Sequence, residues 1–180
     1  MVKRLKKIEE ELIHQNPWWS YKHDRYEKPD GQIGDYWYGS TEGVVMIVPV
    51  MEDGSILLTL QYRYLEDKQS IEFPAGGILQ GMGLLESVQR ELKEETGCLA
   101  REFTKIGSFQ PSNGFIRDET HVFVAKVVSQ GIQELDDTEE IELLYRRPDE
   151  IEDMIRRNDI WDGQSMASWS LVRHYFIDEQ

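Results

Sequence analysis

The chain has 180 residues, with 34 acidic against 20 basic side chains and a formal net charge of −14. This length fits one domain with a sizeable core, and the acidic balance disfavours nucleic acid and anionic membranes as partners, because both attract clustered Lys and Arg. A substrate that carries phosphates would therefore need a bridging cation. Cys98 is the only cysteine and the 4 histidines are scattered, so we expect neither a disulfide nor a zinc site. No apolar run is as long as a membrane span, and we expect a cytoplasmic protein.

The first half of the chain is predicted to form an aromatic arm followed by strands. A short charged helix is expected over MVKRLKKIEEELI, and an aromatic hairpin around the turn PDG extends the arm to about residue 42. The runs GVVMIVPV and SILLTLQYRY have the length of strands and flank the turn EDG, so we expect them to pair. The stretch QSIEFPAGG is predicted to be a short strand that ends at Pro74 and a glycine pair.

The second half alternates helices with strands. A helix is predicted from about Leu84 to Thr96, and two more at roughly 148–157 and 163–177. Strands are predicted at REFTKIGSFQ, THVFVAKVV and EEIELLYR. Strands outnumber helices and helices lie between them, which predicts an α/β/α layered domain with a mixed central sheet. No repeat or linker divides the sequence, so we expect a single domain over 1–180.

The predicted helix at 84–96 places three carboxylates close together, on Glu91, Glu94 and Glu95. Like charges three or four residues apart cost about 0.2–0.5 kcal/mol per pair. In an acidic protein such a run can be a solvated face. The glycine-rich loop before the helix favours a second interpretation, because glycines let the backbone approach closely and join the carboxylates around one hard cation. Mg²⁺ fits this set of oxygen ligands best.

The stretch GGILQGMGLLESVQRELKEETGC resembles the Nudix box, which reads glycine, five residues, glutamate, seven residues, and then Arg-Glu-apolar-x-Glu-Glu-x-Gly-apolar. The residues in register are Gly76, Arg90, Glu91, Leu92, Glu94, Glu95, Gly97 and Cys98. Met82 replaces the first glutamate of the pattern. Glu86 precedes the motif arginine, Arg90, by four residues, and we expect the two to pair in its place.

Further segments resemble, in their order, the ADP-ribose pyrophosphatase-like branch of the Nudix hydrolases. They are NPWWSYKHDRYEKPDG, YWY, LQYRY, IEFPAGG, PSNGF and DDTEEIE. The resemblance implies a Nudix α/β/α sandwich and hydrolysis, with Mg²⁺ and alternatively Mn²⁺, of a nucleoside diphosphate linked to another moiety, such as ADP-ribose or a nucleotide sugar. The products would be a nucleoside monophosphate and a sugar phosphate. It also implies a homodimer formed through the N-terminal arm. Asn113 occupies the position at which this branch often has a proline associated with a preference for ADP-ribose. The identity of the sugar in the substrate is therefore not predicted.

The resemblance also implies roles for the metal ligands. Glu91 and Glu95 would be the principal magnesium ligands, Glu94 would share a metal or a metal-bound water, and the carbonyl of Ala75 would complete a site. Gly76, Glu86, Arg90 and Gly97 would support the motif.

The catalytic base or water-orienting group would come from the late acidic loop. Glu139 matches the family pattern best, and Glu140 is its near rival. The other interpretation of either glutamate is a solvated turn that leads into a strand.

Five residues outside the motif are candidates for substrate binding. Arg63 would grip phosphate oxygens in a bidentate fork, and the alternative is an exposed strand arginine. Glu72 would reach the metal or a ribose hydroxyl. Trp18, Trp19 and Tyr21 would stack on a base, or fill a dimer interface or the core.

Two competing functions remain open. The first is a catalytically silent Nudix domain that binds a nucleotide as a regulatory module. Met82 and Asn113, which depart from the family pattern, favour this function, whereas the intact carboxylates of the motif argue against it. A different Nudix chemistry, on oxidised nucleoside triphosphates or capped RNA, is the third candidate, and the acidic charge disfavours RNA.

Overall fold

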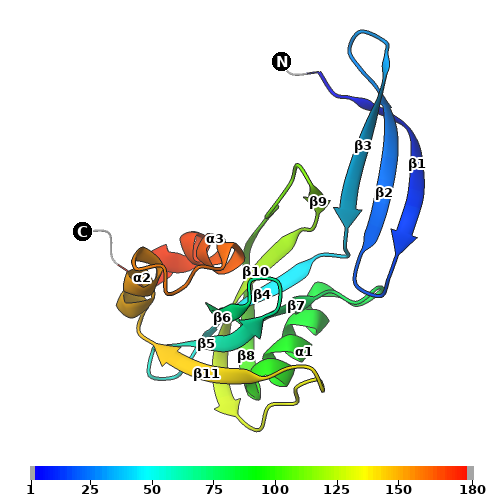
Figure 1. Cartoon of the computed structure of the whole chain (residues 1–180). Helices are drawn as coiled ribbons and strands as arrows, with labels where there is room; N and C mark the ends of the chain where they lie inside the picture. The colour runs from blue at the N-terminus through cyan, green and yellow to red at the C-terminus, as the bar shows by residue number, and fades with distance from the viewer. Residues whose placement is uncertain (1–2, 178–180) are drawn as a thin grey trace.

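The structure is a computed structural model that describes residues 3–177, and it consists of an N-terminal arm and a body (Figure 1). The arm contains three consecutive antiparallel strands, β1 (Lys6–Gln15), β2 (Ser20–Glu27) and β3 (Ile33–Ser40). The short strand β9 (Ile116–Arg117) runs parallel to the end of β3 and attaches the arm to the body.

The predicted N-terminal helix is wrong, because Lys6–Gln15 form strand β1. Its charged side chains bridge to the neighbouring strand: the Lys7 ammonium lies 2.6 Å from Asp24, and the Glu10 carboxylate lies 2.7 Å from Lys22. Lys22 and Lys7 lower the pKa of Glu10 to about 2. The spacing of charged residues in this stretch is compatible with ion pairs along a helix and with ion pairs between two strands. The stretch forms a strand because β2 lies beside it and pairs with it.

The body is built around a mixed sheet of seven strands. They are β4 (Val44–Val50), β5 (Ile56–Arg63), β6 (Lys68–Glu72), β7 (Ala75–Gly77), β8 (Cys98–Phe109), β10 (Thr120–Gln130) and β11 (Ile141–Arg146). The main path of the sheet is β11-β5-β4-β10-β8, with β6 paired to β5 and β7 paired to β4. Strands β4 and β10 are parallel, and the other pairs are antiparallel.

The expected pairing of the two strands that flank the EDG turn is confirmed only next to the turn. Val50 and Ile56 are the one matched pair between β4 and β5. Beyond it the strands separate: β4 pairs along Val44–Val50 with β10, and β5 pairs with β11 and β6. This separation leaves room for β7, and hence for the glycine pair, beside β4.

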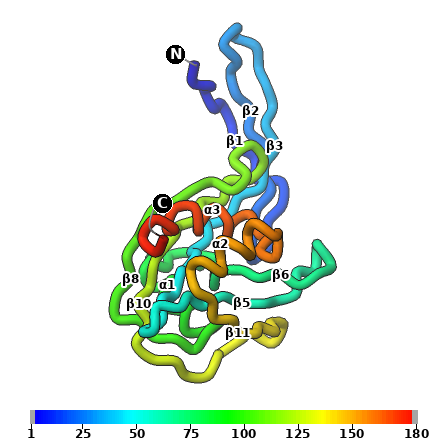
Figure 2. The backbone as a smooth tube through the Cα atoms, turned by 90° about the vertical axis from the view of Figure 1, so that its left-hand side faces the viewer, coloured from blue at the N-terminus to red at the C-terminus, as the bar shows by residue number. Residues whose placement is uncertain are grey.

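Helices cover both faces of this sheet (Figures 1 and 2). They are α1 (Leu84–Thr96), α2 (Pro148–Arg156) and α3 (Gly163–Val172), followed by the 3₁₀ turn η1 (Arg173–Tyr175). Because side chains alternate along a strand, β4 contributes to two cores: Val45 and Ile47 pack with α1, whereas Met46 and Val48 pack on the side of α2 and α3. The α/β/α prediction is therefore confirmed.

Helix α1 has the bounds expected from the sequence, and it ends at Gly97. Gly97 is left-handed, with φ of 69°, and a Cβ there would lie 2.5 Å from the carbonyl oxygen of Gly131. Only glycine fits that position without strain. None of the helices within residues 3–177 combines the length and apolar character needed to cross a membrane.

Candidate functional site

The carboxylates of α1 face strand β7 at the centre of the body. Glu91 and Glu95 are buried, at 7% and 5% exposure, and Glu94 lies half-buried beside them. The backbone N–H of Ala75 donates to Oε2 of Glu95 at 3.0 Å. A Cβ on Gly76 would lie 2.0 Å from the carboxyl carbon of Glu91, so the glycine is what lets this carboxylate approach the backbone.

This arrangement makes the two buried carboxyls hard to ionise. Burial raises the pKa of Glu91 to about 7, with Arg90 acting in the opposite direction and Glu94 adding to the rise. Burial, together with the charge of Glu91, raises the pKa of Glu95 to about 8. A bound cation would favour the ionised form of both carboxyls, because its positive charge offsets the cost of burying their negative charge.

Arg90 supplies the nearest positive charge. Its guanidinium donates to Oε2 of Glu94 at 2.8 Å, to Oε1 of Glu91, and to the carbonyl of Gly77 at 3.3 Å. The expected pairing with Glu86 is wrong: that side chain is exposed, and no bond joins it to Arg90 within residues 3–177. Spacing of four residues allowed the pair, but the buried carboxylates compete more strongly for the guanidinium. The Nε of Arg90 is buried and has no hydrogen-bond partner among the described residues.

Arg63 and Glu72 form an ion pair. The Nε of Arg63 donates to Oε1 of Glu72 at 2.7 Å, and a second guanidinium nitrogen donates to Oε2. Glu72 is buried, whereas the side chain of Arg63 is 46% exposed. Arg63 also lowers the pKa of Glu95, so its charge reaches the carboxylates of α1. The sequence predicted both residues as substrate-binding candidates but did not predict the contact between them.

The late acidic loop carries charge that acts on the buried carboxyls of α1. The charge of Glu139 raises the pKa of both Glu91 and Glu95. The carboxylate of Glu139 accepts the backbone N–H of Asp136 at 3.1 Å. Asp136 also raises the pKa of Glu91, and sequence reasoning did not single it out.

The aromatic candidates of the arm lie in two places. Trp18 and Trp19 are 79% and 43% exposed and line a hollow of about 600 Å³ together with Ile78 and Leu79 of the glycine-rich loop. Tyr21 stacks on Trp37, with ring centroids 6.0 Å apart, and does not line that hollow.

The residues present suit a magnesium ion, although residues 3–177 contain no ready-made cluster of three His, Cys, Asp or Glu side chains around one point. The ligands are carboxylate oxygens, which Mg²⁺ prefers. Gly76 leaves space for them, and the charges of Arg90 and Arg63 do not offset the burial that raises the pKa of Glu91 and Glu95. We name Glu91, Glu94 and Glu95 as the groups that would hold the ion.

Comparison with known proteins agrees with this geometry. A family model described as the NUDIX domain matches residues 40–168. The chain is 29% identical over 141 residues to an ADP-ribose pyrophosphatase of Bacillus subtilis (strain 168), covering 77% of this chain and 76% of the relative. It is also 29% identical over 147 residues to a methanol dehydrogenase activator of Bacillus methanolicus, covering 81% and 80%.

A solved structure, described as a crystal structure of ADP compounds hydrolase, has a similar fold. The TM-score is 0.83 at 20% sequence identity, and the match covers 97% of this chain and 95% of that one. The similarity therefore extends over the arm as well as the body.

Proposed function

Because the chain belongs to the Nudix family, whose model matches residues 40–168, we propose that it is a magnesium-dependent pyrophosphohydrolase of a nucleoside diphosphate linked to another moiety. The predicted fold and the predicted class, a Nudix-family enzyme, are confirmed. The observation that carries the proposal is the pair of buried carboxyls of α1, Glu91 and Glu95, packed against Ala75 and Gly76 of β7. The charge of Glu139 in the late loop adds to the rise in the pKa of both.

The cation would be held by residues of α1 and β7. Glu91 and Glu95 bind the cation, with Glu94 beside them and the carbonyl of Ala75 as a further ligand. The backbone N–H of Ala75 keeps Glu95 in place. When bound, the ion neutralises charge on the diphosphate and lowers the pKa of an attacking water. Mn²⁺ would replace Mg²⁺, since it accepts the same oxygen ligands.

Glu139 orients the attacking water or takes its proton. Its carboxylate accepts a hydrogen bond from the backbone of its own loop, which fixes its direction, and its charge is felt at both buried glutamates. Glu140 remains the alternative base.

Arg63 and the arm would bind the substrate. Glu72 holds the guanidinium of Arg63 by two nitrogens, which orients the remaining donors for phosphate. The hollow beside Trp18 and Trp19 has the size of a ligand site and offers aromatic faces to a base. The relative named as an ADP-ribose pyrophosphatase supports substrates of the ADP-ribose class. A nucleoside monophosphate and a sugar phosphate would be the products.

A panel assay tests this proposal. The pure protein is incubated with Mg²⁺ and ADP-ribose, ADP-glucose, GDP-mannose, UDP-glucose, diadenosine polyphosphates or NADH, and the products are separated by chromatography. We expect a nucleoside monophosphate from at least one compound, no product with EDTA, and recovery with Mg²⁺ or Mn²⁺. Hydrolysis that persists in EDTA would exclude the proposed chemistry.

A second candidate function rests on Arg90. Its guanidinium binds Glu91 and Glu94, which are the groups the metal would need, and this favours a nucleotide-binding domain with little turnover. The same panel separates the two functions. A compound that raises the melting temperature without being cleaved, with Mg²⁺ present, would identify the binding module.

A further inference from the structure

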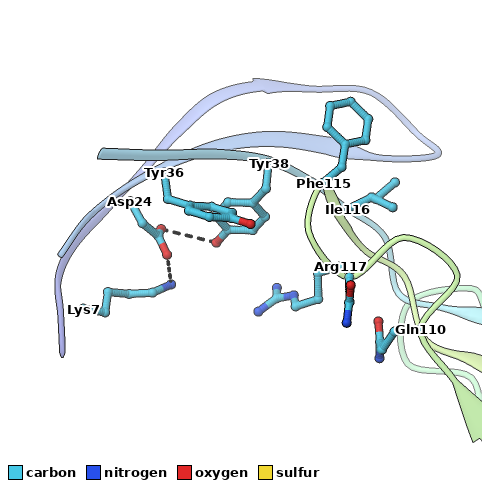
Figure 3. Close-up of a pocket in the computed structure, with 9 residues that line it drawn as sticks. Lys7, Asp24, Tyr36, Tyr38, Gln110, Phe115, Ile116 and Arg117 are labelled. Carbon is cyan, nitrogen blue, oxygen red and sulfur yellow. Dashed lines mark hydrogen bonds and ion pairs between the residues drawn. The ribbon is translucent and has the colours of Figure 1, made fainter. Parts of the chain in front are cut away.

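Two irregular loops of the body are held by different parts of the molecule. The loop at 110–115 contacts the arm: the hydroxyl of Tyr36 donates to the carbonyl of Gly114 at 2.7 Å, and Figure 3 shows Tyr36 together with Gln110 and Phe115 of this loop. The acidic loop at 134–140, which contains Glu139, follows β10 and leads into β11. The bonds that hold this second loop come from helix α1.

The C-terminal end of α1 is capped by the segment that precedes the acidic loop. The last four carbonyl groups of an α-helix have no partner within the helix. The first of these in α1, on Lys93, accepts the N–H of Gly97, as at an ordinary helix end. The others accept bonds from residues 130–134: the backbone N–H of Glu134 donates to Glu94 at 2.8 Å, Nε2 of Gln133 to Glu95 at 2.7 Å, and Nε2 of Gln130 to Thr96 at 3.2 Å.

The side-chain amide of Gln133 connects α1 to both ends of the acidic loop. Besides the carbonyl of Glu95, its Nε2 donates to the carbonyl of Ile141 at 3.2 Å. Gln133 directly precedes the loop, and Ile141 is the first residue of β11. One nitrogen therefore joins the start and the end of the loop to the helix residue whose side chain is a candidate metal ligand. Gln133 is half-buried, which limits the competition of water for these bonds.

Bonds within the loop then fix the direction of Glu139. The backbone N–H of Asp136 donates to Oε2 of Glu139 at 3.1 Å, and the backbone N–H of Glu139 donates to the carbonyl of Asp136 at 2.9 Å. A carboxylate that acts on a water molecule must be held in a narrow range of positions, because a small displacement lowers the rate steeply. The two ends of the loop decide where this bonded turn lies relative to α1.

We propose that Gln133 is a positioning residue: it holds both ends of the acidic loop on the carbonyl of Glu95, and so sets the place of the Glu139 carboxylate relative to the carboxylates of α1. The inference rests on the proposed function, in which Glu139 orients the attacking water or takes its proton. Gln133 acts through the backbone, since its amide donates to carbonyl oxygens of the chain.

Gln133→Met and Gln130→Met form a matched pair of variants. Each removes a side-chain amide that donates to a carbonyl at the end of α1, and methionine keeps the approximate volume of the side chain. The second bond of Gln133 goes to Ile141, at the end of the loop, whereas the second bond of Gln130 is accepted from the hydroxyl of Tyr145, inside β11. We therefore expect similar melting temperatures for the two variants and different behaviour of the acidic loop.

Amide hydrogen exchange on the full chain in EDTA, followed by NMR, measures the loop without metal or substrate. The backbone N–H of Glu139 is the reporter, because its bond to the carbonyl of Asp136 lasts only while the turn keeps its conformation. We expect this N–H to exchange about tenfold faster or more in Gln133→Met, and within about twofold of the wild type in Gln130→Met. Equal rates in the two variants would overturn the proposal.

Steady-state kinetics on a compound that the wild type cleaves gives the second readout. Gln133→Met should lower kcat by about tenfold or more and change KM by less than about twofold, because a displaced base impairs the chemical step while other groups bind the substrate. Gln130→Met should change neither quantity. A rise in KM at unchanged kcat, or equal losses in the two variants, would contradict the assigned role.

The two readouts also separate the failure of this inference from the failure of the proposed function. A wild type that cleaves no compound of the panel would refute the proposed hydrolysis. The exchange comparison needs neither metal nor substrate, so it still decides whether Gln133 holds the acidic loop. Turnover in the wild type with unchanged exchange and unchanged kcat in Gln133→Met would refute the role of Gln133 alone.

Discussion

Arg90 lies within reach of several carboxylates, and the structure pairs it with Glu91 and Glu94. Glu86, at the spacing expected for a helical ion pair, stays exposed. A guanidinium in contact with buried carboxylates interacts at lower effective dielectric than it would with an exposed one. Position on the helix therefore predicted which residues can meet Arg90, and burial decided which of them do.

Glu86→Gln should consequently be nearly silent. We expect kcat/KM to change by less than about twofold and the free energy of unfolding by less than about 0.5 kcal/mol, as for surface positions in general. Steady-state kinetics and urea unfolding measure the two quantities. Glu94→Gln removes an observed partner of Arg90 and serves as the positive control. An effect of Glu86→Gln larger than these limits would show that Glu86 does hold the guanidinium of Arg90.

The two buried carboxyls also make the stability of the metal-free protein depend on pH. Their pKa values rise from 4.5 to about 7 for Glu91 and about 8 for Glu95. Below the pKa of the unfolded chain, both the folded and the unfolded protein keep these protons, so the two groups do not make stability depend on pH there. Between that value and the folded pKa the unfolded chain releases protons that the folded chain keeps, so stability falls as pH rises and levels off above about pH 8.

Urea midpoints in EDTA from about pH 5 to about pH 9 measure this decline. Glu95→Gln should flatten it, because glutamine imitates the protonated acid and its amide oxygen can accept the N–H of Ala75. The same variant should abolish hydrolysis with Mg²⁺. Saturating Mg²⁺ should reduce the decline in the wild type, since the ion favours the ionised carboxylates. A profile that is the same in the variant and the wild type would assign the decline to other groups.

At the scale of elements, the contact between β7 and α1 builds the site. Strand β7 reaches this position because β4 and β5 separate after one matched pair, and α1 packs its apolar stripe on β4. The carboxylate of Glu91 then occupies the space where a side chain at residue 76 would be.

Gly76→Ala should therefore displace the carboxylate of Glu91 from β7. We expect weaker Mg²⁺ binding and a loss of about 1 kcal/mol in the free energy of unfolding, at the low end for overpacking because the displaced atoms are the end of a flexible side chain. Gly77→Ala is the matched control, because a Cβ there meets nothing within 4 Å. Urea unfolding and calorimetric titration with Mg²⁺ give the comparison. Equal effects of the two substitutions would mean that the close approach at Gly76 does not matter.

At the scale of the whole molecule, the arm extends from the body (Figure 1). Several of its apolar side chains are exposed. Ile8, Leu12 and Trp37 are between 49% and 54% exposed. Such a surface is typical of a protein interface, and we expect the arm to form a homodimer as the family resemblance implies.

Ile8→Asp should shift the protein towards the monomer, because an added charge in an apolar interface is costly to bury. Ile132→Asp is the matched control: this isoleucine is 90% exposed and lies outside the arm. Light scattering coupled to gel filtration measures the mass of each variant. A wild type that elutes as a monomer, or equal behaviour of the two variants, would refute dimerisation through this part of the arm.

The sequence by itself determined the Nudix motif, the bounds of α1 and the layered fold. These features depend on local information: the helical spacing of Leu84, Val88 and Leu92, the left-handed stop at Gly97, and strand-length apolar runs. The candidate metal ligands could be named for the same reason, since residues three and four apart on a helix are neighbours wherever the helix packs.

Only the tertiary structure decided which partners those residues have. The strand at Lys6–Gln15, the parallel pairing of β4 with β10, and the contact of Arg63 with Glu72 each depend on a partner strand that the pattern of either segment does not specify. Burial, which raises the pKa of Glu91 and Glu95, exists only once the sheet and helices have packed together.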